Sequence, residues 1–89
     1  MTDVSTKHPS GLPFVELTDS GRKISFRRDC LGEVMISRTV DGGEEKLLVE
    51  GIRPPYTDQD DFPVGSHITY TIKLDYNQQK HQYTLEVWL

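Results

Sequence analysis

Hydrophobic and polar residues alternate with a period of two along most of this chain. The clearest case is residues 67–75, where Ile68, Tyr70, Ile72 and Leu74 are separated by single polar residues. Successive side chains of a β-strand point to opposite faces of a sheet, so this pattern predicts a strand with one buried face. No apolar run follows the 3.6-residue period of a helix. The pattern therefore predicts an all-β chain.

Six further strands are predicted from alternation and from β-branched composition. They are expected at residues 14–17, 23–27, 33–40, 45–50, around Tyr56, and at 82–89. Turn-forming segments separate them, and Asp41-Gly42-Gly43 supplies the positive-φ residues of a tight hairpin. In the strand at 23–27, Ile24 and Phe26 are expected inward and the charges outward.

About seven short strands with turn signals every 8 to 12 residues are typical of a two-sheet antiparallel β-sandwich. A small barrel is the alternative architecture. Residues 1–12 are polar and turn-forming, and we expect a flexible N-terminal arm there, followed by one β-sandwich domain at residues 13–89. The chain of 89 residues is of single-domain size.

Several segments occur in an order that resembles a fibronectin type III domain. A strand with Ile24 and Phe26 is followed by a strand ending in Arg38 and a polar hairpin, and a Tyr-x-Asp segment and a Pro-x-Gly turn into the next strand come later. The segments that carry this resemblance are Ile24-Ser25-Phe26, Val34 to Gly43, Leu47-Leu48, Pro55-Tyr56-Thr57-Asp58 and Phe62 to Ile72. The chain departs from the family pattern at two positions, with Phe26 where a Trp is usual and Ile68 where a corner Tyr is usual.

The resemblance implies an immunoglobulin-like sandwich of fibronectin type III topology, in which strands A, B and E lie opposite strands C, C′, F and G. It also implies a role as a spacer or binding module and brings no active site with it.

The composition excludes some partners and one kind of crosslink. Fourteen acidic and ten basic residues give a net charge of −4, which opposes the phosphate backbone of nucleic acids. The single Cys30 allows no internal disulfide, a usage that weakly favours the cytoplasm. No signal peptide and no membrane span are visible, so we expect no membrane partner.

No motif for catalysis or for a cofactor is present, and we expect neither an enzyme nor a bound cofactor. Cys30 has no histidine close in sequence to act as its base. The carboxylates of Asp58, Asp60 and Asp61 could offer oxygens to calcium, but they lack the spacing of a calcium loop. A solvated turn in which Asp58 bonds nearby backbone is the better interpretation, so no metal is assigned.

Four residues are candidates for binding: Trp88, Tyr83, Arg27 and Lys23. The alternation of the last strand places Trp88 opposite Tyr83, Leu85 and Val87, so its indole is expected to face away from the core. Aromatic residues with one apolar and one wet side are enriched at interfaces. The alternative is that the indole packs over a neighbouring strand.

Lys23 and Arg27, with Arg22 and Arg28, concentrate positive charge on one strand and its ends. Such a cluster could recognise an acidic partner, although cross-strand pairing or solvation explains it as well. The sequence thus predicts a non-catalytic protein-interaction or structural module, with a protein partner or self-association. A carbohydrate-binding module is the alternative, in which Trp88 and either Tyr76 or Tyr83 would form the sugar platform.

Overall fold

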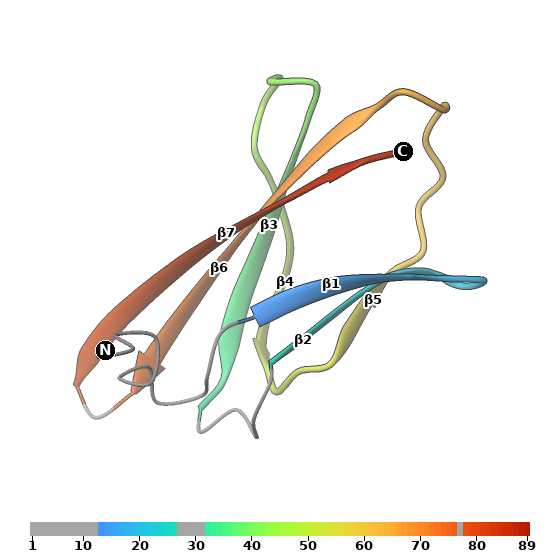
Figure 1. The fold of residues 1–89 in the computed structure, drawn as a ribbon. Helices are drawn as coiled ribbons and strands as arrows, with labels where there is room; N and C mark the ends of the chain where they lie inside the picture. The colour runs from blue at the N-terminus through green and yellow to red at the C-terminus, as the bar shows by residue number, and fades with distance from the viewer. Residues whose placement is uncertain (1–12, 27–31, 77) are drawn as a thin grey trace, which may run out of the picture.

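The structure, a computed structural model, describes residues 13–26, 32–76 and 78–89. These residues form seven strands and no helix (Figure 1). The strands are β1 (Pro13–Thr18), β2 (Gly21–Phe26), β3 (Val34–Val40), β4 (Lys46–Ile52), β5 (Tyr56–Asp58), β6 (His67–Tyr76) and β7 (Gln79–Trp88). No helix in these ranges could therefore cross a membrane. The expected arm at residues 1–12 lies outside the described residues.

The strands form two antiparallel sheets, with the orders β1-β2-β5 and β4-β3-β6-β7. The two sheets cross one another as separate layers (Figure 1). An all-β sandwich is therefore confirmed, and the small barrel is not what forms. Strand β7 begins at Gln79, three residues before the expected start, because the pair Tyr76 and Gln79 closes a hairpin with a two-residue connection.

The hairpin between β3 and β4 turns where the sequence predicted. Asp41 has φ 52° and Gly42 has φ 72°, and the amide of Gly43 donates to the carbonyl of Val40 at 2.9 Å. Two consecutive positive φ angles are the signature of a type I′ turn, whose twist matches that of the flanking strands. The chain therefore reverses at Asp41 and Gly42 as predicted, and the pairing of β3 with β4 begins further on, at Arg38 and Lys46.

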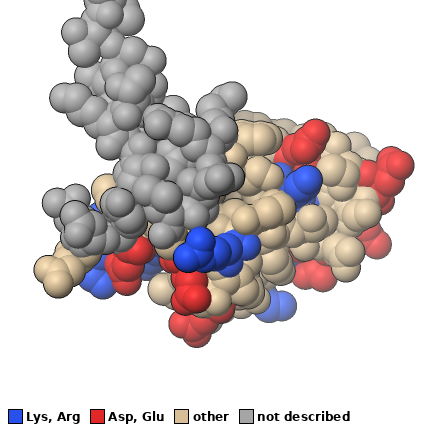
Figure 2. Space-filling model, turned by 90° about the horizontal axis from the view of Figure 1, so that it is seen from below, with Lys and Arg blue, Asp and Glu red and all other residues tan. Residues whose placement is uncertain are grey.

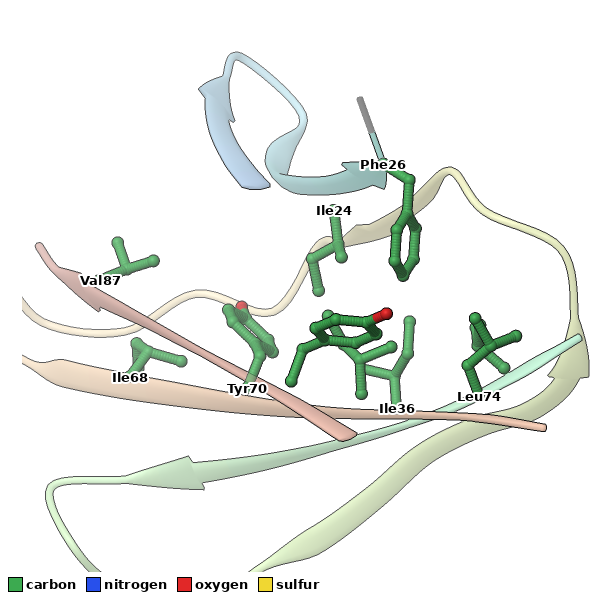
Figure 3. Close-up of a cluster of buried hydrophobic side chains, with 10 residues drawn as sticks. Ile24, Phe26, Ile36, Ile68, Tyr70, Leu74 and Val87 are labelled. Carbon is green, nitrogen blue, oxygen red and sulfur yellow. The ribbon is translucent and has the colours of Figure 1, made fainter. Parts of the chain in front are cut away.

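The core lies between the two sheets and consists of the predicted inward positions. Ile24 and Phe26 of β2 point across the interlayer space toward side chains of β3, β6 and β7 (Figure 3). The four alternating residues of β6 (Ile68, Tyr70, Ile72 and Leu74) are all at most 1% exposed. Burying one such aliphatic side chain stabilises the fold by about 1.5 to 3 kcal/mol.

The larger sheet has two unlike edges. Along β4 the pairing with β3 shifts register twice, between Val34 and Met35 and between Ile36 and Ser37, and Gly51 has a positive φ of 73°. Such bulges bend a strand and interrupt its pairing edge. Along β7 the pairing with β6 is regular over all ten residue pairs. The β4 edge is thus irregular and the β7 edge is straight.

Candidate binding surface

An exposed aromatic cluster lies on the outer face of the larger sheet, where β7 ends. We call it the Trp88 patch, and it consists of Trp88, His67 and Glu86. Trp88 is 65% exposed, which agrees with the predicted outward placement of its side chain. Its indole stacks on the imidazole of His67, with ring centroids 4.4 Å apart and planes 11° apart. The imidazole Nε2 lies 2.8 Å from Glu86 Oε1.

The strand register holds this patch together. His67 and Trp88 are direct cross-strand partners, so their rings are brought side by side by the pairing of β6 with β7. The amide of His67 donates to Asp41 Oδ1 at 2.9 Å, which ties the start of β6 to the β3–β4 hairpin. Because the stack and these bonds already orient the indole, little side-chain freedom remains to be lost on binding.

The chain beside the patch adds one more exposed apolar side chain. Val64 is 95% exposed, and the next residue, Gly65, donates its amide to the carbonyl of Leu89. The carboxylates of Glu86 and Asp41 lie at the same end of the sheet. This end of the molecule therefore presents apolar side chains beside negative charge.

The other predicted binding residues do not join Trp88. Tyr83 is only 8% exposed and belongs to the core, where its ring meets that of Phe26 edge-on at 5.6 Å between centroids. The alternation along β7 predicts that Tyr83 points inward, and it does. The expectation that Tyr83 belongs to an exposed binding surface is therefore wrong. Lys23 lies on β2 in the smaller sheet. Arg27 and Arg28 lie outside the described residues, as does Cys30.

Arg22, one of the four basic residues considered for an acidic partner, follows the alternative of cross-strand pairing, because it lies opposite Asp58 of β5. It is 7% exposed, and its Nε donates to the Tyr70 hydroxyl at 2.9 Å. Its Nη2 donates to the carbonyl oxygens of Asp58, at 3.1 Å, and Asp60. Arg22 points to the same side of β2 as Ile24, toward the core. The groups that accept its hydrogen bonds come from β5, β6 and the segment after β5.

Asp58 is the centre of this buried network. Arg38 Nη1 lies 2.9 Å from both carboxylate oxygens of Asp58 and 2.9 Å from Asp60 Oδ2. The Tyr70 hydroxyl donates to Asp58 Oδ2 at 2.6 Å. With an exposure of 2%, Asp58 does not lie in the solvated turn that the sequence predicted, although it accepts the expected backbone bond, from the amide of Asp60 at 3.2 Å.

The network joins the two sheets. Arg22 and Asp58 come from β2 and β5 of the smaller sheet, whereas Arg38 and Tyr70 come from β3 and β6 of the larger one. The ring of Phe62 lies 5.4 Å from the guanidinium of Arg22 and 4.7 Å from that of Arg38, which adds a cation–π contact to each. We call these four polar residues the inter-sheet network.

The inter-sheet network shifts the pKa values of Asp58, Tyr70 and Arg38. Burial alone would raise the pKa of Asp58, but the hydrogen bonds from Tyr70 and Arg38 outweigh it and hold the pKa below its ordinary value. Burial and the bond to Asp58 raise the pKa of the Tyr70 hydroxyl far above its ordinary value of 10.0. Burial opposes the charge of Arg38, but its bonds to Asp58 and Asp60 raise its pKa overall. The buried negative charge of Asp58 and the positive charge of Arg38 are thus kept at neutral pH.

The raised pKa of Tyr70 predicts a loss of stability in alkali. In the unfolded chain a tyrosine ionises near pH 10, whereas folded Tyr70 keeps its proton there. The unfolded state then binds fewer protons than the folded state, so the free energy of unfolding falls as pH rises above about 10. Tyr56, whose pKa is also raised, acts in the same direction. Urea denaturation at a series of alkaline pH values should show a shallower fall in Tyr70→Phe than in the parent, and equal slopes would contradict this origin.

No group of three or more metal-ligating side chains occurs within the described ranges. The carboxylate of Asp58 is already occupied by Arg38 and Tyr70, so in this structure it faces protein donors. What the inter-sheet network can do is hold two layers in one relative position, because every bond in it is directional.

A hollow of about 750 Å³ lies at the opposite end of β6 and β7 from the Trp88 patch. Acidic and basic side chains line it together, including Glu33, Lys73, Asp75 and Lys80. Seen from below, the described acidic and basic side chains of the molecule are interspersed (Figure 2). A surface of mixed sign does not attract a polyanion strongly. The hollow therefore offers no concentrated positive charge to a polyanionic ligand.

Comparison with known proteins gives no relative. No protein-family model matches the chain, and no curated protein or solved structure shows significant similarity to it.

Proposed function

We propose that this chain is a non-catalytic protein-interaction module with a fibronectin type III-like topology. The sheet orders β1-β2-β5 and β4-β3-β6-β7 correspond to strands A, B, E and C′, C, F, G, the arrangement that the sequence resemblance implied. This correspondence supports the topology. The support for a binding role comes from the surface around Trp88.

The observation that carries the proposal is the exposed Trp88 held in a stack with His67. Tryptophan is one of the side chains enriched among residues that dominate binding energy. Leaving one 65% exposed forgoes the stabilisation that burying its apolar area would give, at about 25 cal/mol per Å². A partner surface that covers the indole recovers this energy.

The charges beside Trp88 define the partner that it fits. Glu86 and Asp41 lie at the same end of the sheet, and the whole chain carries a charge of −4. An arginine or lysine beside apolar side chains on the partner would meet both the indole face and the carboxylates. The proposed occupant is therefore a protein that presents an apolar patch edged with basic residues.

Carbohydrate binding is supported less well. A sugar platform of two rings was expected from Trp88 with Tyr83 or Tyr76, but Tyr83 lies in the core. One ring face of Trp88 is taken by His67, so a single indole face is left for a sugar. A protein partner uses the edge of the indole as well as its face.

The experiment compares Trp88→Ala with Leu17→Ala in capture of protein partners from a cell extract. Leu17 is 64% exposed, almost the same as Trp88 at 65%, but lies in the smaller sheet. We expect Trp88→Ala to lose the captured proteins while its free energy of unfolding changes by less than about 1 kcal/mol. Leu17→Ala should keep them.

Two outcomes would overturn the proposal. One is equal capture by both variants, because binding would then not depend on the indole. The other is Trp88-dependent binding to a glycan array with no Trp88-dependent protein, which would favour the carbohydrate alternative.

A further inference from the structure

The straight edge of β7 is a second surface, distinct from the face that carries the Trp88 patch. Among the described residues β7 pairs only with β6, and β1 of the other sheet lies beside it without pairing. Leu89, which follows β7, directs its amide toward Ser66 on the β6 side. Alternate residues of a strand direct their peptide groups to opposite edges.

The peptide groups of five residues of β7 therefore point away from β6. These residues are Lys80, Gln82, Thr84, Glu86 and Trp88. Unpaired peptide groups of this kind are a template for another strand, and proteins usually protect them with bulges, charges or short length. The β4 edge of the same sheet has two bulges and the charged residues Lys46 and Glu50, and β5 has only three residues. The ten-residue β7 is regular throughout.

The charges along this edge are arranged for pairing with itself. Lys80 lies near the beginning of β7 and Glu86 near its end, and both side chains are on the outer face. An antiparallel second β7, related by a two-fold axis at Tyr83, places Lys80 of each copy opposite Glu86 of the other. Gln82 of each copy then lies opposite Thr84 of the other. The two Lys80–Glu86 pairs and the two Gln82–Thr84 pairs all bring together peptide groups that point away from β6.

We propose that the β7 edge binds a second copy of this chain by antiparallel strand pairing, with Lys80 of one copy opposite Glu86 of the other. The result is one continuous eight-stranded sheet. Because the two-fold axis is perpendicular to that sheet, both Trp88 patches lie on the same face, near opposite ends of the paired strands. Two such patches would let the dimer hold a partner bivalently.

A charge swap tests the register, with sedimentation equilibrium at micromolar to millimolar concentrations as the measurement. Lys80 is 88% and Glu86 51% exposed in its side chain, so neither substitution should unfold the chain. Glu86→Lys alone and Lys80→Glu alone each place like charges opposite one another twice in the dimer. Each should weaken dimerisation by about tenfold or more.

The decisive sample is an equimolar mixture of the two single variants. Glu86→Lys gives an all-basic edge and Lys80→Glu an all-acidic one, so the mixture should associate more tightly than either variant alone. The double variant Lys80→Glu with Glu86→Lys should dimerise to within about threefold of the parent. No dimer of the parent protein at any concentration would overturn the proposal, and so would a dimer indifferent to these charges.

Thr84→Pro tests the edge separately from the register. Its amide points away from β6, so proline removes no hydrogen bond between strands that the structure describes but blocks an added strand. We expect a folded monomer by circular dichroism and sedimentation. A folded Thr84→Pro that still dimerises as the parent does would place the interface elsewhere. None of these measurements uses the partner of the Trp88 patch, so the dimer and the proposed function can fail independently.

Discussion

Asp58→Ala should lower the free energy of unfolding by about 3 to 5 kcal/mol, the range found when one member of a buried ion pair is removed. The carboxylate is 2% exposed and accepts bonds from Arg38 and Tyr70. Its removal leaves the charge of Arg38 without its main partner inside the fold. Since a domain of this size has a total stability of about 4 to 13 kcal/mol, the variant should lose a large part of it.

Asp60→Ala is the matched control. Asp60 also contacts Arg38, at 2.9 Å, but its side chain is 60% exposed, so water can replace the lost bond. The expected cost is less than about 1 kcal/mol. Urea denaturation followed by circular dichroism measures both variants. Similar losses in the two variants would show that burial of Asp58 between the sheets is not what makes it important.

Ile72→Ala should cost about 2 to 5 kcal/mol, because it removes three carbons at a site with 0% exposure and leaves a cavity. Ile72 pairs with Ile36 on one side and with Tyr83 on the other, so the cavity would lie at the centre of the larger sheet. Close packing on both sides limits how far the site can collapse around the missing atoms.

The neighbouring Thr71→Ala is the control for register. Thr71 faces the outer side of the sheet and is only partly buried, so its substitution should cost less than about 1 kcal/mol. The same urea denaturation applies. If Thr71→Ala lowered the free energy of unfolding as much as Ile72→Ala, then Ile68, Tyr70, Ile72 and Leu74 would not be the residues of β6 that face the core.

The period-two pattern predicted the architecture well because sheet faces are set by local alternation. Ile72 and its neighbours in β6, Ile24 and Phe26 in β2, and the outward Trp88 all follow from parity alone. The tight turn at Asp41 and Gly42 followed from the need for positive φ. These features depend on a few consecutive residues, which is the range in which sequence patterns are informative.

The inter-sheet network was missed because its members are far apart in sequence. Arg22 was considered only as part of a basic cluster and Arg38 only as the end of a strand, although both have the inward parity of Ile24 and Ile36. Parity was the signal that could have found them. Their partner Asp58 lies on a separate strand, and only the pairing of β2 with β5 brings it to Arg22.

The Trp88 patch was half predictable. Alternation in β7 gave the outward indole, but the stack on His67 depends on the register between β6 and β7, which the hairpin after Tyr76 sets. The same alternation points Tyr83 inward. Tyr83 was named as a binding residue because it is aromatic, although its position in the alternating pattern already placed it in the core.

Tryptophan fluorescence tests the central claim, that Trp88 presents an exposed indole for binding, most directly. The chain has a single tryptophan, so the emission comes from this residue alone. We expect emission typical of a solvated indole and ready quenching by acrylamide in the folded protein, with a blue shift when a captured partner covers the ring. Emission typical of a buried indole, resistant to quencher and accompanied by strong destabilisation in Trp88→Ala, would place Trp88 in the core and contradict its role as an exposed binding residue.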